Sequence, residues 1–245
     1  MPKTLFIADL HLSDDRTDIS DLFCHFLAHN AVGADALYIL GDLFEVWFGD
    51  DNPNPFNYQI AAAIKQLADT GVPVYFIHGN RDFTVGKRFA KASGMTILPE
   101  KMVIDLYGHN ALIMHGDSLC TLDVAYQKFR KKSRKKWWQA IMLSLPLFYR
   151  QKLANDARKR SQENNKEKSQ TIMDVTQSEV VSEMQTFNVD LLIHGHTHRP
   201  NRHNFDVEGK TFERIVLGDW YEQGSLLEVT PQGMSLINQA FLAND

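Results

Sequence analysis

Acidic, amide and imidazole side chains follow five apolar runs of the sequence, at the point where each run ends. The first pair is Asp9 and His11, two residues apart just after the run 4–7. Because alternate residues of extended backbone point to the same side, both side chains can face one point beyond a strand. Polar groups at such places are costly to bury unless they are paired or bind a metal. The candidate ligands are Asp9, His11, Asp42, Asn80, His115, His196 and His198.

These candidates offer nitrogen and oxygen donors and no thiolate, which suits one or two divalent metal ions. Manganese fits this donor set better than a structural zinc, with iron, zinc and cobalt as open alternatives. Glycines stand beside the ligands, as at Gly41, Gly79, Gly116 and Gly195. They suit backbone that turns sharply or approaches a neighbour closely. The pattern therefore predicts a metal site built on strand-end loops.

The elements that must position these residues follow from hydrophobic periodicity. Strands alternate with helices at first, and shorter strands follow from residue 96. This order favours a mixed α/β fold in which two sheets pack together with helices outside. Strand ends are where α/β folds gather their ligand sites. The principal predicted strands are 4–7, 36–40, 74–77, 103–106, 111–114 and 190–193, and the predicted helices outside the basic segment are about 19–31, 56–70, 85–93 and 169–187.

The composition is that of a soluble globular protein. The chain has 245 residues, of which 44% are hydrophobic and 23% charged, enough for a full core in one domain. Cys24 and Cys120 lack CxxC spacing and are expected to be buried free thiols in a reducing compartment. The first residues show no signal-peptide pattern. The longest apolar stretch, 140–149, contains Ser144 and Pro146 and is far shorter than the roughly 20 residues that a membrane span needs.

The net charge of −4 is unevenly distributed along the chain. Residues 128–160 contain twelve Lys or Arg and a single acidic residue, and they include Trp137 and Trp138. Cationic residues beside aromatic ones suit an anionic bilayer surface and a pocket for acyl chains. Pro146 is expected to divide this segment into two helices, which favours a lid. The alternative is a solvated basic helix whose apolar face joins the core.

The five motifs, in the order Asp-x-His, Gly-Asp, Gly-Asn, His-Gly and Gly-His-Thr-His, resemble those of the calcineurin-like metallophosphoesterases. They span residues 9–198. The resemblance implies a double β-sandwich flanked by helices and two divalent ions, with Mn²⁺ as the expected metal. It implies a first metal held by Asp9, His11, Asp42 and His198. It implies a second held by Asn80, His115, His196 and the bridging Asp42, and a water activated by both metals as the nucleophile.

One position departs from the common pattern of that family. Most members carry His after the Asn of the third motif, where it can protonate an alkoxide leaving group, whereas this chain has Arg81. Arginine stays protonated and is a poor proton donor, but its planar fork matches phosphate oxygens. A leaving group that is already a phosphate needs little protonation. Arg81 therefore favours cleavage of a diphosphate over cleavage of an alkyl phosphate ester.

A closer resemblance is to the bacterial UDP-2,3-diacylglucosamine hydrolase family of lipid A biosynthesis, and it covers nearly the whole chain. It rests on the stretches 39–45, 78–83 and 193–200 and on the helical segment after Asp123. It implies one domain over residues 1–245 with a helical lid at about 123–168. It also implies attack of metal-activated water on the α phosphorus, giving UMP and 2,3-diacylglucosamine 1-phosphate (lipid X). The expected location is peripheral, on the cytoplasmic face of the inner membrane.

The same resemblance implies roles for individual residues. The expected catalytic residues are Asp42, Asn80, Arg81 and His115. The expected substrate contacts are Asn80, Arg81, Asp123, Ser161, Asn165, Lys168 and His196. Ser161, Asn165 and Lys168 are spaced so that they share one helical face. The expected partners are the lipid-linked UDP-sugar and the anionic membrane surface, with no nucleic acid and no obligate protein partner.

Two other functions are compatible with parts of the sequence. A cyclic-nucleotide or nucleic-acid phosphodiesterase could use the same dinuclear site and the basic, Trp-containing segment. Arg81 and the acidic remainder of the chain argue against it. A catalytically inactive scaffold would be expected to lack ligands, and all seven are present. Acyl-chain length, the physiological metal, oligomeric state and the role of His194 are left open.

Overall fold

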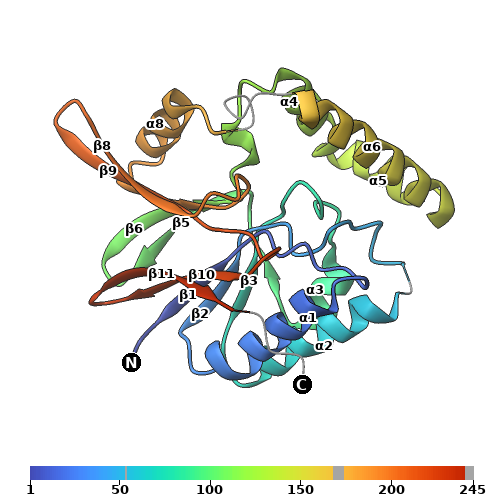
Figure 1. Ribbon diagram of the computed structural model, residues 1–245, viewed down its shortest axis with the longest axis horizontal. Helices are drawn as coiled ribbons and strands as arrows, with labels where there is room; N and C mark the ends of the chain where they lie inside the picture. Colours follow the sequence, from blue (N-terminus) through green and yellow to red (C-terminus); the bar gives the residue numbers. More distant parts are fainter. Residues whose placement is uncertain (53, 168–173, 241–245) are drawn as a thin grey trace.

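Two mixed β-sheets form the centre of the protein, whose computed structural model describes residues 1–52, 54–167 and 174–240 (Figure 1). The first sheet has six strands in the order β11-β10-β1-β2-β3-β4, and the second has five in the order β5-β6-β7-β9-β8. The strands are β1 (Thr4–Ile7), β2 (Ala36–Ile39), β3 (Val74–Phe76), β4 (Thr96–Ile97), β5 (Lys101–Leu106), β6 (His109–Met114), β7 (Leu191–His194), β8 (Asn201–Val207), β9 (Lys210–Val216), β10 (Gly224–Thr230) and β11 (Gly233–Gln239).

Parallel pairing aligns the strand ends that carry the candidate ligands. In the first sheet Ile7 of β1 pairs with Ile39 of β2, and Ile39 pairs with Phe76 of β3. In the second sheet β6 and β7 are parallel, with Ile113 beside Ile193. The carboxyl ends of these strands therefore lie at a common edge of each sheet, and the loops that follow them begin side by side.

The main core lies between the two sheets. Phe6 and Leu227 of the first sheet pack in one buried cluster with Ile113, Ile193 and Ile215 of the second. The neighbours of Phe6 in β1, Leu5 and Ile7, face the other way and pack with the outer helices. Both faces of β1 are therefore buried, which explains why its sequence is a continuous apolar run instead of an alternating one.

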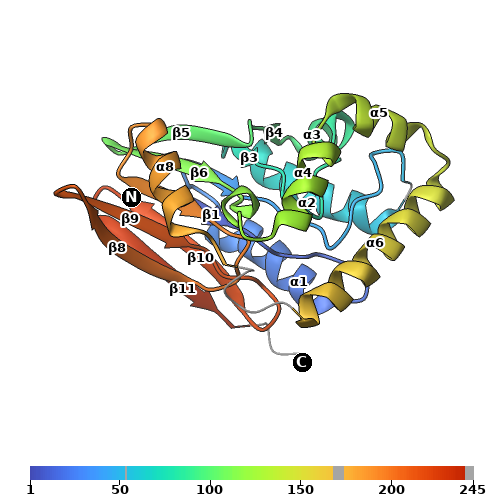
Figure 2. The ribbon, with the colours of Figure 1, turned by 90° about the horizontal axis from the view of Figure 1, so that it is seen from above.

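Helices cover the outer faces of both sheets (Figures 1 and 2). The first sheet is covered by α1 (Thr17–His25), the π-helical turn η1 (Phe26–Asn30), α2 (Pro55–Asp69) and α3 (Lys87–Ser93). The second is covered by α8 (Gln177–Thr186), whose Val180 and Met184 pack with Leu112 and Leu192. The predicted two-sheet α/β fold is confirmed. Of the helix predicted over 169–187, residues 169–173 lie outside the described residues. Residues 174–176 are not helical, because the extended Thr176 is the cap residue that precedes α8.

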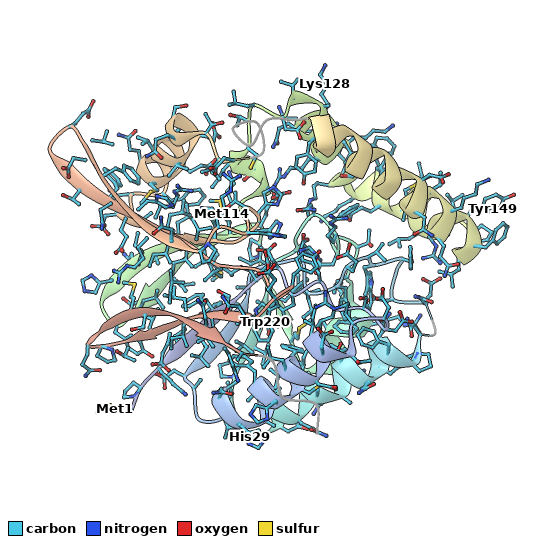
Figure 3. All side chains as sticks on the ribbon, viewed as in Figure 1. Met1, His29, Met114, Lys128, Tyr149 and Trp220 are labelled. Atoms are coloured by element: carbon cyan, nitrogen blue, oxygen red, sulfur yellow. The ribbon has the colours of Figure 1, made fainter. Side chains whose placement is uncertain are left out.

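Residues 124–167 form three insertion helices, named here α4 (Val124–Ser133), α5 (Lys136–Ser144) and α6 (Leu147–Glu167). The break at Pro146 is as predicted, but a second break at Arg134 and Lys135 was not, so the segment has three helices instead of two. Figures 1 and 2 place α6 and the β8–β9 hairpin at opposite ends of the molecule. Figure 3 shows Lys128 and Tyr149 on this part, well away from the central Trp220.

Two further predictions concern membrane spans and thiols. Across the described ranges of the chain, every helix is too short or too polar to cross a bilayer, as predicted. Neither cysteine forms a disulfide, and Cys120 is buried while Cys24 is half-buried. The prediction that neither is in a disulfide is therefore confirmed, although Cys24 is less buried than expected.

Candidate metal centre

The loops that leave the parallel strands are joined by backbone hydrogen bonds beyond the strands themselves. Asp9 N donates to Gly41 O at 3.1 Å, and His11 N donates to Asp42 O at 3.0 Å. In the second sheet Gly195 N donates to His115 O at 2.9 Å. These bonds extend the pairing past each strand end and hold the ligand-bearing loops in register. Asp9, His11, Asp42 and His115 are all buried as a result.

The backbone at the ligands is left-handed. In the described part of the chain, eight residues other than glycine have positive φ, and five of them are candidate ligands. Such a conformation is uncommon outside glycine, although Asp and His adopt it more readily than most residues, and it costs energy that the surroundings must offset. Their clustering at one place marks it as the functional site. The five ligands, with φ from 51° to 72°, are Asp9, His11, Asp42, His196 and His198.

Asp9, His11 and His198 form a first cluster of donor atoms. The Nε2 atoms of His11 and His198 lie 3.3 Å apart, and His198 Nε2 lies 3.5 Å from Asp9 Oδ1. Two imidazole nitrogens at that separation need a proton or a cation between them. Asp9 Oδ1 is buried and has no hydrogen-bond partner among the described residues. A buried carboxylate oxygen without a hydrogen bond is costly, so these atoms fit a bound metal ion.

Asp42 lies between this cluster and the histidine of the fourth motif. Its Oδ2 is 3.9 Å from His11 Nε2, and its Oδ1 is 3.8 Å from His115 Nε2. One carboxylate therefore faces ligands of both predicted metals, which suits the bridging role expected for it. Asp9 also belongs to a second group of mutually close donors, with Asp42 and His115.

The remaining predicted ligands surround His115. Its Nε2 is 3.0 Å from Asn80 Oδ1, and its Nδ1 is 2.8 Å from Leu40 O, which orients the ring. The ring of His196 packs edge-on to that of His115 at 5.0 Å between centroids, and His196 N donates to Asp9 Oδ2 at 2.7 Å. The structure thus brings all seven candidates into one centre. The imidazole of His196 belongs to neither of the two tight donor groups.

Steric crowding explains why the third motif has a glycine at position 79. A Cβ on Gly79 would lie 2.1 Å from Asp42 Oδ1, so any other residue would push the Asp42 carboxylate out of place. Gly195 is similar, because its Cβ would meet Asp9 Oδ2 at 2.4 Å. Close approach of backbone to the ligands, which only glycine permits, explains why the motifs pair glycine with them.

Three carboxylates that support the ligands were not predicted. Glu45 Oε2 lies 3.1 Å from His11 Nδ1, and Asp219 Oδ2 lies 3.1 Å from His198 Nδ1. Carboxylates behind ligating histidines fix the ring orientation and the tautomer. Asp82 Oδ1 and Oδ2 accept from Gly79 N at 2.8 Å and Leu43 N at 2.7 Å, which ties two ligand loops together. Asp219 follows β9, so a carboxylate just past a strand end was the signal available for it.

The electrostatics favour positive charge at the first cluster. Burial alone would lower the pKa of His198, but the flanking Asp219 and Asp9 raise it to about 10. Burial would raise the pKa of Asp9, but His198 and the other nearby imidazoles hold it well below the usual range. The buried carboxylates therefore stabilise a cation at this point. Burial, aided by the charge of Asp42, raises the pKa of Asp82 to about 7.

His194 makes two contacts within the fold. Its Nδ1 donates to Gly195 O at 2.7 Å, and its Nε2 lies 3.4 Å from Arg214 Nη1. Burial and the charge of Arg214 lower its pKa to about 3, so the ring stays neutral. Both ring nitrogens are engaged in these contacts.

Arg81 borders the centre. Its backbone N donates to Asp42 Oδ1 at 2.8 Å, and its Nη1 lies 3.8 Å from Glu45 Oε1. Its Nε is buried and lacks a hydrogen-bond partner within the described residues. A guanidinium with an unsatisfied donor beside a metal centre can bind an oxyanion.

The predicted substrate contacts on the insertion helices are only partly visible. Asp123 caps α4, with its side chain accepting from Tyr126 N at 3.1 Å. The backbone at Ser161 and Asn165 belongs to α6, but their side chains lie outside the described part of the structure, as does Lys168 entirely. Their predicted role stays a prediction.

The sequence is similar to known proteins along nearly its whole length. Residues 2–200 match the model of the calcineurin-like phosphoesterases. The chain belongs to this family. It is 56% identical to the UDP-2,3-diacylglucosamine hydrolase of Photobacterium profundum, over 97% of each chain. It is 55% identical to the protein of that name from an Enterobacter species and 56% identical to that from Escherichia coli O6:H1, in both cases over 97% of this chain and 99% of the relative. The resemblance predicted from the five motifs is therefore confirmed.

Proposed function

We propose that the protein hydrolyses the diphosphate bond of UDP-2,3-diacylglucosamine to UMP and 2,3-diacylglucosamine 1-phosphate. The observation that carries this proposal is similarity over nearly the full length to hydrolases of that name. Arg81 beside the centre agrees with it, since a diphosphate needs charge stabilisation more than it needs a proton donor.

Two divalent ions, with Mn²⁺ as the expected metal, would supply positive charge at phosphorus and an activated water when bound. Asp9, His11 and His198 would hold one ion, and Asn80, His115 and His196 the other. Asp42 would bridge them, since its two oxygens face His11 and His115. Glu45 and Asp219 would keep the outer nitrogens of His11 and His198 protonated and their inner nitrogens free to act as ligands.

Arg81 would bind the phosphate that leaves with the acylated sugar. Its buried Nε has an unused donor, and its backbone is fixed to Asp42, so the side chain starts from a defined position next to the bridging carboxylate. Glu45 near Nη1 restrains the guanidinium without using Nε. Negative charge that develops on the leaving phosphate would be stabilised by this fixed cation.

The insertion helices would hold the acyl chains and face the anionic membrane surface, forming a lid at about 123–168 on a single domain. α5 buries none of its residues, so its apolar face does not join the core. Nine of the fourteen large exposed hydrophobic side chains in the described structure lie at residues 122–153. Six exposed lysines lie among them. These lysines are Lys128, Lys131, Lys132, Lys135, Lys136 and Lys152.

The test uses UDP-2,3-diacylglucosamine in detergent with Mn²⁺ and ¹⁸O-labelled water. We expect UMP to appear with the label in its phosphate, because the α phosphorus is attacked. Label in the acylated sugar phosphate would place the attack on the β phosphorus, and release of UDP would place cleavage on the sugar side. Faster hydrolysis of a cyclic nucleotide or an alkyl phosphodiester would favour the phosphodiesterase function. EDTA should abolish turnover, and added Mn²⁺ should restore it.

A further inference from the structure

The first insertion helix contacts the three loops that carry the second-metal ligands. The connection runs through Asp117, which follows His115 by two residues and is 1% exposed. Its Oδ2 accepts from Tyr126 Oη at 2.6 Å, from Arg130 Nε at 2.8 Å and from Arg134 Nη2 at 3.4 Å. All three donors belong to α4 or to the residue that ends it. A buried carboxylate with these three donors fixes α4 against the His115 loop.

Arg134 also reaches the loop of the third motif. Its Nη2 donates to Gly79 O at 2.9 Å, directly before Asn80, and its guanidinium lies over the ring of Phe83 at 5.2 Å. The same side chain therefore joins the Asn80 loop to the Asp117 carboxylate. Loss of Arg134 would leave both the carbonyl and the carboxylate with one donor fewer.

The fifth motif is contacted by Tyr126. Its ring lies nearly parallel to that of His196, with centroids 6.3 Å apart, while its hydroxyl is held by Asp117. Within the described residues, α4–α6 form no hydrogen bond or ion pair with Asp9, His11 or His198. The supporting contacts of His11 and His198 come from Glu45 and Asp219 of the main body. In the described structure the side chains that support the two halves therefore come from different parts of the chain, although His196 and His198 share one loop.

We propose that Asp117, Tyr126 and Arg134 are positioning residues that couple α4 to the second metal site. In this arrangement α4 holds the loops of Asn80, His115 and His196 at the spacing that metal binding needs. Displacement of α4 weakens the second site and leaves the first intact. The proposal rests on the proposed dinuclear centre but not on the identity of the substrate.

The test measures Mn²⁺ binding to the full-length protein after chelation, from the electron paramagnetic resonance signal of free Mn²⁺, with no substrate present. The unmodified protein should show two classes of site. Arg134→Ala should weaken only the second class, by about tenfold or more, as loss of a residue behind a ligand does. Arg134→Lys should recover part of this loss, because lysine can still donate to Asp117 or to Gly79 O.

Arg150→Ala is the matched control. Arg150 is a buried arginine of α6 that also fastens an insertion helix to the main body, through Phe48 O at 2.6 Å and the carboxylate of Asp51. Both partners lie beyond Asp42 in the loop between β2 and α2, and in the described structure Arg150 contacts none of the loops that carry Asn80, His115 and His196. If the loss of Mn²⁺ affinity in Arg134→Ala came from general loosening of the insertion, Arg150→Ala would show the same loss. We expect Arg150→Ala to bind Mn²⁺ at both classes of site with unchanged affinity.

Tyr126→Phe gives a milder independent test, because it removes only the hydroxyl donor to Asp117 and keeps the ring beside His196. We expect a smaller loss that is again confined to the second class. The proposal is overturned if Arg134→Ala binds both classes normally, weakens both equally, or matches Arg150→Ala. A single class of site in the unmodified protein would overturn it as well. Because no substrate is used, none of these outcomes bears on the diphosphatase activity, which the labelled-water assay tests separately.

Discussion

The strand-end loops and the insertion helices differ in how they are held. The loops leave parallel strands that are buried on both faces, and backbone hydrogen bonds continue between them past the strand ends. The insertion helices are mostly exposed, and α5 contributes nothing to the core. Their principal polar attachments in the described structure are the arginines at Asp117 and Asp51. The proposed chemistry thus lies on the firmly held loops, whereas the proposed recognition of the lipid lies on a part that is held at few points.

This comparison predicts that substitutions in the loops reduce turnover and metal binding, whereas substitutions on the insertion change substrate affinity. The largest effect is expected for Asp42→Ala, which removes the carboxylate that faces both half-sites. Activity should fall by far more than the roughly 100-fold that loss of a residue behind a ligand costs. Metal content measured by elemental analysis should fall below one ion per chain. Two retained ions would contradict the bridging role.

Arg81→Ala should come next, with a loss of about 100-fold in kcat, or about 3 kcal/mol, as for a single donor to a developing negative charge. Metal content should be unchanged, because only the backbone N of Arg81 contacts a ligand. Steady-state kinetics measured on the diphosphate and on an alkyl phosphate ester shows whether the loss is specific to the diphosphate. If the variant kept wild-type activity on the diphosphate, Arg81 would have no role in the mechanism.

Asp219→Asn should have an intermediate effect on the first metal site. The variant keeps the shape of the side chain but removes the negative charge beside His198 Nδ1. We expect metal affinity to fall by about 10- to 100-fold, with a matching need for higher Mn²⁺ in the assay. A loss confined to the second class of sites in the Mn²⁺ titration would show that the two half-sites have been assigned the wrong way round.

The smallest effect is expected on the insertion. Phe148→Glu places a charge where 62% of an aromatic side chain is exposed. Loss of one apolar contact with acyl chains or membrane is worth about 1.5–3 kcal/mol, so KM for the lipid substrate should rise about tenfold or more. The kcat should stay unchanged in the same assay.

Val32→Glu is the control for Phe148→Glu, because Val32 is 46% exposed on the main body, away from the insertion. It should leave KM unchanged, and binding to anionic vesicles should weaken only for Phe148→Glu. Equal effects of both variants would mean that the insertion does not bind the lipid.

The gathering of the candidate ligands could be predicted because these residues combine two local signals, an apolar run and a polar residue at its end. Such signals can be recognised without knowledge of the fold, as at Asp9 and His11, which follow the apolar strand β1. Asp219 and Glu45 were missed because their role arises from contacts with residues distant in sequence, such as His198 and His11.

The boundaries of helices were predicted less well than their presence. The early start predicted for α8 came from extending its apolar periodicity backwards, past the extended Thr176. The break at Arg134 was missed because no proline or glycine marks it. At this break, Arg134 contacts Gly79 and Asp117, which are distant in sequence.

The left-handed backbone at five ligands has a consequence for protein design. Grafted onto ordinary strand ends of another scaffold, five of the seven side chains would point elsewhere, because φ values of 51–72° set their directions. A transplanted centre needs the five turns and the glycines that pack against them, and a library that varies side chains alone would not find it.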